Sequence, residues 1–158
     1  MIIGLIRGTV RPGVERKIAE SYFIECIREC TDYNPKVILT LEPINRYETN
    51  LYNSIQSMQA IIDKLNRPNI KMLIDTFHMN IEEPNMIESI LKAKDYIEHV
   101  HFADSNRWAP GCGHVNFPEI IKILQKINYC GAISAEILPK PSPEESARLT
   151  IEYYKKLG

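Results

Sequence analysis

Four apolar, β-prone runs in this sequence each lead to a side chain that can bind a metal ion. These side chains are Glu42 after Val37–Leu41, Asp75 after Ile70–Ile74, His101 within Ile97–Phe102 and Glu136 within Ala132–Ile137. Three carboxylates and one imidazole suit a hard or borderline divalent ion such as Mn²⁺, Mg²⁺ or Co²⁺. Two carboxylates from different strands could also move protons on opposite faces of one bound molecule. One such residue alone reads most simply as a helix cap or an ion-pair partner, but four at equivalent positions predict a shared site.

Other polar residues lie near these positions in the sequence. His78 follows Asp75 by three residues, which suits either a hydrogen-bonding partner of a metal ligand or a substrate contact. Arg107 lies in segment 104–114, which is rich in Pro and Gly, and is either a positioned cation or an exposed loop residue. Glu48 belongs to the polar turn that follows the second apolar run.

The elements that would position these residues alternate between strand and helix. The expected strands are Ile2–Ile6, Val37–Leu41, Ile70–Ile74, Ile97–Phe102 and Ala132–Ile137, and the expected helices are Val14–Glu29, Ser54–Leu65, Met86–Lys94, Phe117–Ile127 and Pro143 to about Lys156. Asn116 with Glu119, and Ser142 with Glu145, have the spacing of helix N-terminal caps. This alternation predicts an α/β protein with a parallel sheet, and the strand ends would form a site at the mouth of a barrel. A doubly wound sheet is the alternative, although the sequence has no Gly-rich phosphate loop.

Composition narrows the class of protein. The chain has 158 residues, a formal net charge of −1, 44% hydrophobic and 25% charged residues, which suits one globular domain over residues 1–158. The charge indicates neither nucleic acid nor an anionic membrane as a partner, and no apolar run approaches the roughly 18 residues of a membrane span. Residues 1–7 do not resemble a signal peptide, and the four cysteines show no CxxC spacing. We therefore expect a cytoplasmic protein with buried, reduced thiols.

Five motifs spread over most of the chain carry a family resemblance. They are Leu41-Glu-Pro-Ile-Asn-Arg-Tyr-Glu-Thr-Asn50, Asp75-Thr-Phe-His78, His101-Phe-Ala-Asp-Ser-Asn-Arg107, Pro110-Gly-Cys-Gly113 and Ala135-Glu136. In order and spacing they resemble the xylose isomerase-like TIM-barrel superfamily. Within it they most resemble the sugar isomerase/epimerase group that contains D-tagatose and D-psicose 3-epimerases.

The resemblance implies a function for each of these positions. It implies a divalent ion, usually Mn²⁺, with Mg²⁺, Co²⁺ or Zn²⁺ as alternatives, held by Glu42, Asp75, His101 and Glu136. It implies that the two glutamates are the catalytic acid/base pair, which removes and returns a proton of a keto-sugar through an enediolate. It also implies that Glu48, His78 and Arg107 bind and orient the substrate.

The chain departs from the family pattern in its number of units. A full barrel has eight βα units in about 250 residues, and this chain supplies five, which correspond to strands four to eight. We therefore predict that the open barrel edges self-associate or pair with a second polypeptide. A truncated, non-catalytic remnant that binds a metal or a partner chain is an alternative function. An endonuclease-IV-like phosphodiesterase is a third, although its Asp-x-His is here His114-Val-Asn116.

Overall fold

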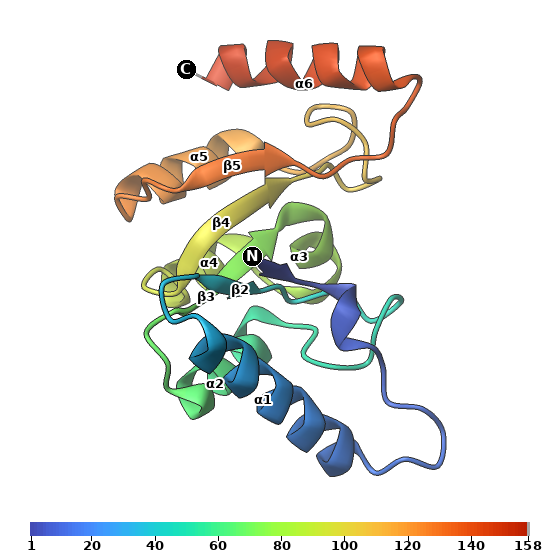
Figure 1. Ribbon diagram of the computed structural model, residues 1–158. Coiled ribbons are helices and arrows are strands. Elements are labelled where there is room, and N and C mark those ends of the chain that lie inside the picture. The colour runs from blue at the N-terminus through green and yellow to red at the C-terminus, as the bar shows by residue number, and fades with distance from the viewer. Residues whose placement is uncertain (158) are drawn as a thin grey trace.

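The computed structural model describes residues 1–157, which form a five-stranded parallel sheet surrounded by helices (Figure 1). The strands are β1 (Ile2–Ile3), β2 (Leu39–Leu41), β3 (Ile70–Asp75), β4 (Ile97–Phe102) and β5 (Ala132–Ala135), and they neighbour one another in chain order. The helices are α1 (Arg16–Tyr33), α2 (Ile55–Leu65), α3 (Thr76–Glu82), α4 (Met86–Lys92), α5 (Phe117–Lys126) and α6 (Pro143–Leu157), with a short 3-10 helix, η1 (Leu5–Arg7). The expected α/β architecture of five parallel strands is confirmed.

The register of the sheet brings the ends of neighbouring strands together. Asp75 at the end of β3 pairs with His101 in β4, and His101 pairs with Ser134 in β5. Parallel strands run in one direction, so the residues that leave their carboxyl ends gather at one edge of the sheet. Glu42 and Glu136, which directly follow β2 and β5, therefore emerge at the same edge as Asp75 and His101.

The hydrophobic core lies between the sheet and its helices. The central strands contribute fully buried side chains such as Met72, Ile74, Val100 and Phe102. Helix α2 presents one apolar face to them, made of Ile55, Met58, Ile61, Ile62 and Leu65 at helical spacing. Burying each of these side chains contributes roughly 1.5–3 kcal/mol, so the packing of helices onto β2, β3 and β4 holds the central strands in place.

Local hydrogen bonds set several helix starts. Asn116 accepts from the backbone N–H of Glu119 at the start of α5, and Ser142 accepts from that of Glu145 in α6, as the sequence predicted. Ser54 makes a reciprocal capping box with Ser57 at the start of α2. These caps satisfy backbone donors that have no partner within the first helical turn.

Several segments differ from the expectations. Helix α1 continues to Tyr33 rather than ending at Glu29, and β5 ends at Ala135 rather than Ile137. The first strand ends at Ile3 rather than Ile6, because β1 is an edge strand and the following residues turn into η1. The segment after Asp75, expected as a loop, is helix α3, because Oδ1 of Asp75 accepts from the backbone N–H of Phe77 at 2.7 Å and caps the helix. The cap places His78 on the first turn of α3, close to the end of β3.

The edge strands β1 and β5 leave apolar surface uncovered. Met1 and Ile2 are 64% and 44% exposed, whereas the central strands are mostly buried. A cavity of about 480 Å³ lies between the two edges and is lined by Met1, Ile2, Ile38, Thr40, Glu98, His99, Gly131 and Ala132. Residues of both edges line one cavity, so the sheet curves like part of a barrel.

Two further expectations concern membranes and thiols. Within residues 1–157 there is no helix with the length and apolar character needed to cross a membrane. All four cysteines are free, as expected, but Cys26, Cys30 and Cys130 are exposed, so the expectation of buried thiols is wrong for these three.

Candidate metal centre

The four residues predicted as metal ligands come together at the carboxyl edge of the sheet. Glu42, Asp75 and His101 are buried, and Glu136 is about half exposed. His101 lies at the centre of the group, because its Nδ1 is 3.9 Å from Oε1 of Glu42, 3.7 Å from Oδ2 of Asp75 and 3.6 Å from Oε2 of Glu136. A single imidazole nitrogen therefore faces three carboxylates from three separate strand ends.

A second histidine, His78, lies at the same centre. Glu42, Asp75, His78 and Glu136 offer ligand atoms that all lie within 4.8 Å of one another, a spacing that could hold a metal ion. Nε2 of His78 is 3.8 Å from Oε1 of Glu42. Either His78 or His101 could thus be the fourth metal ligand beside the three carboxylates. Their hydrogen bonds differ and indicate which ring has a free nitrogen.

The two rings differ in the nitrogen that remains free. Nδ1 of His78 lies 2.8 Å from the side-chain amide nitrogen of Asn45 and also accepts from the Asn45 backbone N–H. The same amide nitrogen donates to Glu48, and Oδ1 of Asn45 accepts from Tyr47, so the amide orientation is fixed by its other contacts. Nδ1 of His78 is therefore an acceptor, and a neutral ring carries its proton on Nε2.

Three buried atoms at the centre have no hydrogen-bond partner within the described residues. They are Oε1 of Glu42, Oδ2 of Asp75 and Nδ1 of His101. Buried polar atoms are almost always paired in folded proteins, so unpaired ones that converge on one point call for a shared partner. Two carboxylate oxygens and an imidazole nitrogen match the donor set of a divalent cation. The residues present therefore fit such an ion.

The charges of the cluster shift the pKa values of its members. Burial, with repulsion from Asp75 and Glu136, raises the pKa of Glu42 to about 8. Burial alone would lower the pKa of His101, but the nearby carboxylates of Asp75, Glu136 and Glu42 favour its charged form and raise the pKa to about 9. The nearby ring of His101 lowers the pKa of Glu136 to about 2 despite partial burial. Glu42 and His101 thus hold protons near neutral pH that a bound cation would displace.

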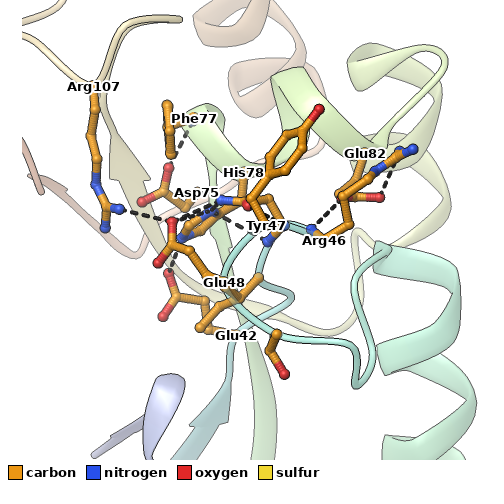
Figure 2. Close-up of polar contacts among 12 residues, drawn as sticks. Glu42, Arg46, Tyr47, Glu48, Asp75, Phe77, His78, Glu82 and Arg107 are labelled. Carbon is orange, nitrogen blue, oxygen red and sulfur yellow. Dashed lines mark hydrogen bonds and ion pairs between the residues drawn. The ribbon is translucent and has the colours of Figure 1, made fainter. Parts of the chain in front are cut away.

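Arg107 points toward Glu48 beside the cluster (Figure 2). Its guanidinium donates to Oε1 of Glu48 at 3.0 Å and to Oε2 of Glu136 at 3.3 Å, and it lies 5.0 Å above the ring of Phe77. The structure therefore places Glu48, His78 and Arg107, the three residues predicted to bind substrate, beside the four predicted metal ligands. The roles assigned to these seven residues stay predictions.

Sequence reasoning missed several residues that support the site. Arg46 forms a two-pronged ion pair with Glu82, which ties the turn that carries Glu48 to helix α3. Arg7 donates to the backbone carbonyl of Glu42. Both arginines are separated from their partners by some 35 positions of the chain, and no local spacing pattern signals such a contact.

The chain belongs to the xylose isomerase-like TIM-barrel family, because residues 2–157 match the model of that family. It is 36% identical over 127 residues to an L-ribulose 3-epimerase of Methylomonas sp. (strain DH-1), which covers 79% of this chain and 44% of that protein. It is 41% identical over 100 residues to a D-psicose 3-epimerase of Enterocloster bolteae, which covers 63% of this chain and 33% of that protein. The chain thus spans less than half the length of these curated relatives.

Solved structures show the same family at the level of the fold. A D-allulose 3-epimerase from Methylomonas sp. in complex with D-allulose matches with a TM-score of 0.84 and 29% sequence identity, over 95% of this chain and 59% of that chain. The five-stranded sheet with its helices therefore corresponds to part of a TIM barrel. The expected fold and the family resemblance are both confirmed.

Proposed function

We propose that this chain carries the metal centre and the acid/base pair of a keto-sugar 3-epimerase. The observation that carries the proposal is the convergence of three unpaired buried atoms, on Glu42, Asp75 and His101, at the carboxyl edge of the sheet. The names of the matched relatives support the choice of reaction, because they are 3-epimerases of ketoses.

His101, rather than His78, is proposed as the fourth ligand beside Glu42, Asp75 and Glu136. The support is the pattern of hydrogen bonds: Nδ1 of His101 is unpaired, whereas Nδ1 of His78 accepts from Asn45 and leaves the proton on Nε2. A metal ligand needs a free lone pair on nitrogen. With its proton on Nε2, His78 would instead donate a hydrogen bond to a substrate oxygen.

The proposed reaction inverts one carbon by moving a proton. One carboxylate of the Glu42–Glu136 pair takes the proton from C3 of the keto-sugar, and the electron pair moves into the neighbouring carbonyl to give an enediolate. The other member returns a proton to the opposite face of C3, and the carbonyl re-forms. When bound, the divalent cation, for which Mn²⁺ is the first choice, supplies positive charge that favours the enediolate. Glu48, His78 and Arg107 orient the sugar between the two carboxylates.

Thermal unfolding with Mn²⁺ and with EDTA is the first test. An ion that binds only the folded state stabilises it by RT ln(1 + [L]/Kd), so the midpoint should rise with Mn²⁺ in the wild type and much less in Glu42→Gln. Glu83→Gln is the matched control, because Glu83 accepts from the backbone N–H of Ile55 away from the centre. The Mn²⁺-loaded chain is then incubated with D-fructose or D-allulose in ²H₂O. Deuterium incorporation at C3 supports the proposal, and a wild type with no midpoint shift refutes it.

A second candidate is metal or partner binding without turnover. It is favoured by the exposed edge residues Met1 and Ile2, which suit contact with a partner. A midpoint shift with Mn²⁺ but no deuterium incorporation across a panel of keto-sugars would select this candidate over the first.

We also propose that strands of a second copy or of another polypeptide pair with the free edges of β1 and β5. Unpaired edge strands beside exposed apolar side chains favour association. Light scattering after size-exclusion chromatography tests this for the chain alone. A chain that stays monomeric at all concentrations would count against pairing with a second copy.

A further inference from the structure

The loop between β4 and α5 is built around one buried carboxylate. Asp104, two residues after the end of β4 at Phe102, is completely buried. Its Oδ1 accepts from the backbone N–H groups of Ser105 and Val115 at 2.8 and 3.0 Å, and its Oδ2 accepts from that of Gly111 at 2.8 Å. One side chain thereby binds the beginning, the middle and the end of an eleven-residue loop, residues 105–115.

The loop backbone comes unusually close to this carboxylate. A Cβ atom built on Gly113 would overlap with Oδ1 of Asp104 and with the hydroxyl of Ser105. Only glycine therefore allows this approach, which explains one of the glycines in the segment. The close approach indicates that contacts with Asp104 help to form the loop conformation, in addition to the burial of Ala109.

Arg107 lies inside the same loop in an unusual backbone conformation. Its φ of 60° is in the left-handed region, which non-glycine residues rarely adopt. Its backbone N–H donates to the carbonyl of Asp104 at 2.8 Å, and the backbone N–H of Asp104 donates to the carbonyl of Trp108 at 3.0 Å. The carbonyl of Arg107 accepts from Leu138 at 2.7 Å, in the segment that follows Glu136. The direction of the Arg107 side chain thus depends on a turn that begins and is closed at Asp104.

We propose that Asp104 is the positioning residue for Arg107. Its carboxylate closes the loop, holds Arg107 in the left-handed conformation and so aims the guanidinium between Glu48 and Glu136. Within residues 1–157, the Asp104 side chain makes no hydrogen bond to these two carboxylates or to the metal-site atoms. Its effect on the substrate passes through Arg107. The inference rests on the proposed function, in which Arg107 orients the sugar.

The test is a double-mutant cycle on the Mn²⁺-loaded full chain, with D-fructose and D-allulose as probes. The variants are Asp104→Asn, Arg107→Ala and the double variant. Asparagine keeps the size of the side chain but replaces one acceptor oxygen with a donor that faces backbone N–H groups. Glu83→Gln is the matched control, because it alters another carboxyl group that accepts a backbone N–H, far along the chain from Arg107.

We expect Asp104→Asn to lower kcat/KM on the order of 100-fold, the scale of a misplaced substrate-orienting group, while the midpoint shift with Mn²⁺ persists. In the Arg107→Ala background the same change should lower kcat/KM no further, since the group that it positions is gone. Glu83→Gln should leave kcat/KM near that of the wild type. An equal loss in both backgrounds, or no loss in the single variant, would overturn the proposal.

A second measurement separates this inference from the proposed function. If the wild type turns over neither sugar, the proposed function fails, and NMR still reads the position of Arg107. In the wild type the amides of Gly111 and Val115 should exchange slowly with solvent and the guanidinium of Arg107 should show a distinct, slowly exchanging signal. Asp104→Asn should abolish both features and Glu83→Gln neither. A guanidinium signal that survives Asp104→Asn refutes the positioning role.

Discussion

Replacing Glu42 with glutamine should change stability in opposite directions in the metal-free and the Mn²⁺-loaded protein. Folding raises the pKa of this carboxyl group from an ordinary 4.5 to about 8, mainly through burial and then through repulsion from Asp75 and Glu136. Between these two pH values the unfolded chain binds fewer protons than the folded one, so the free energy of unfolding falls as pH rises. At about 1.4 kcal/mol per pH unit, the loss reaches on the order of 3–5 kcal/mol by pH 8. Glutamine has the same shape and no charge, so the variant avoids this loss.

With Mn²⁺ the order of the two proteins should reverse. A cation at a thousandfold excess over its Kd stabilises the folded wild type by about 4 kcal/mol, which raises the midpoint by roughly 2–4 °C per kcal/mol for a chain of this size. Glu42→Gln removes one of the anionic ligands and with it most of this rise. The cation thus compensates in the wild type for the repulsion that the variant relieves in its absence.

Urea unfolding at pH 5 and pH 8, each with EDTA and with Mn²⁺, measures all four free energies. In EDTA the difference between variant and wild type should grow in favour of the variant from pH 5 to pH 8. Glu83→Gln should show no such pH-dependent reversal, because its carboxyl group lies outside the cluster. A variant that is less stable than the wild type at pH 8 in EDTA, or that keeps the full Mn²⁺ effect, would refute the reasoning.

Three other substitutions test separate parts of the structure. Gly4→Ala would place a Cβ 2.8 Å from Oε2 of Glu42, and the backbone of Gly4 lies outside the regions that other residues favour, so we expect alanine to destabilise the fold and to reduce the Mn²⁺-induced rise in midpoint; an unchanged rise would contradict this. Asn45→Asp replaces the donor to Nδ1 of His78 with an acceptor, so ¹⁵N NMR should show the ring proton leaving Nε2 or a second proton joining it, and sugar binding should weaken while Mn²⁺ binding persists. Phe117→Ala removes a fully buried ring packed 4.9 Å from that of Phe102 and should cost about 3–5 kcal/mol in urea unfolding; a loss below 1 kcal/mol would show that this part of the core is loosely packed.

The order and direction of the strands were predictable from the sequence, although the ends of β1 and β5 were not. Apolar runs at regular intervals predicted five parallel strands, and β4 begins and ends at the expected residues. Parallel strands end at one edge, so Asp75 and His101 could be predicted as neighbours before any distance was known. Helix starts at Asn116 and Ser142 were also predictable, because a helix cap joins residues only three positions apart in the chain.

Edge strands and short helices were less predictable, because their lengths depend on neighbours. The first strand was expected to reach Ile6 but ends at Ile3, since within residues 1–157 only one side of β1 pairs with a strand. Helix α3 was expected as a loop, because the sequence indicated Asp75 as the end of a strand but not as the cap of a following helix. In the structure Asp75 does both. Propensity alone does not decide between such alternatives.

The sequence by itself determined the chemical groups of the site and the strand ends that carry them. Only the tertiary structure decided which atoms face one another: it brought His78 beside the carboxylates, gave Nδ1 of that ring to Asn45 and left Nδ1 of His101 without a partner. It also closed the loop that aims Arg107 around the carboxylate of Asp104. The physical reason is that hydrogen bonds act over about 3 Å of space, whereas contacts such as Asn45 with His78 and Glu48 with Arg107 join residues 33 and 59 positions apart in the chain.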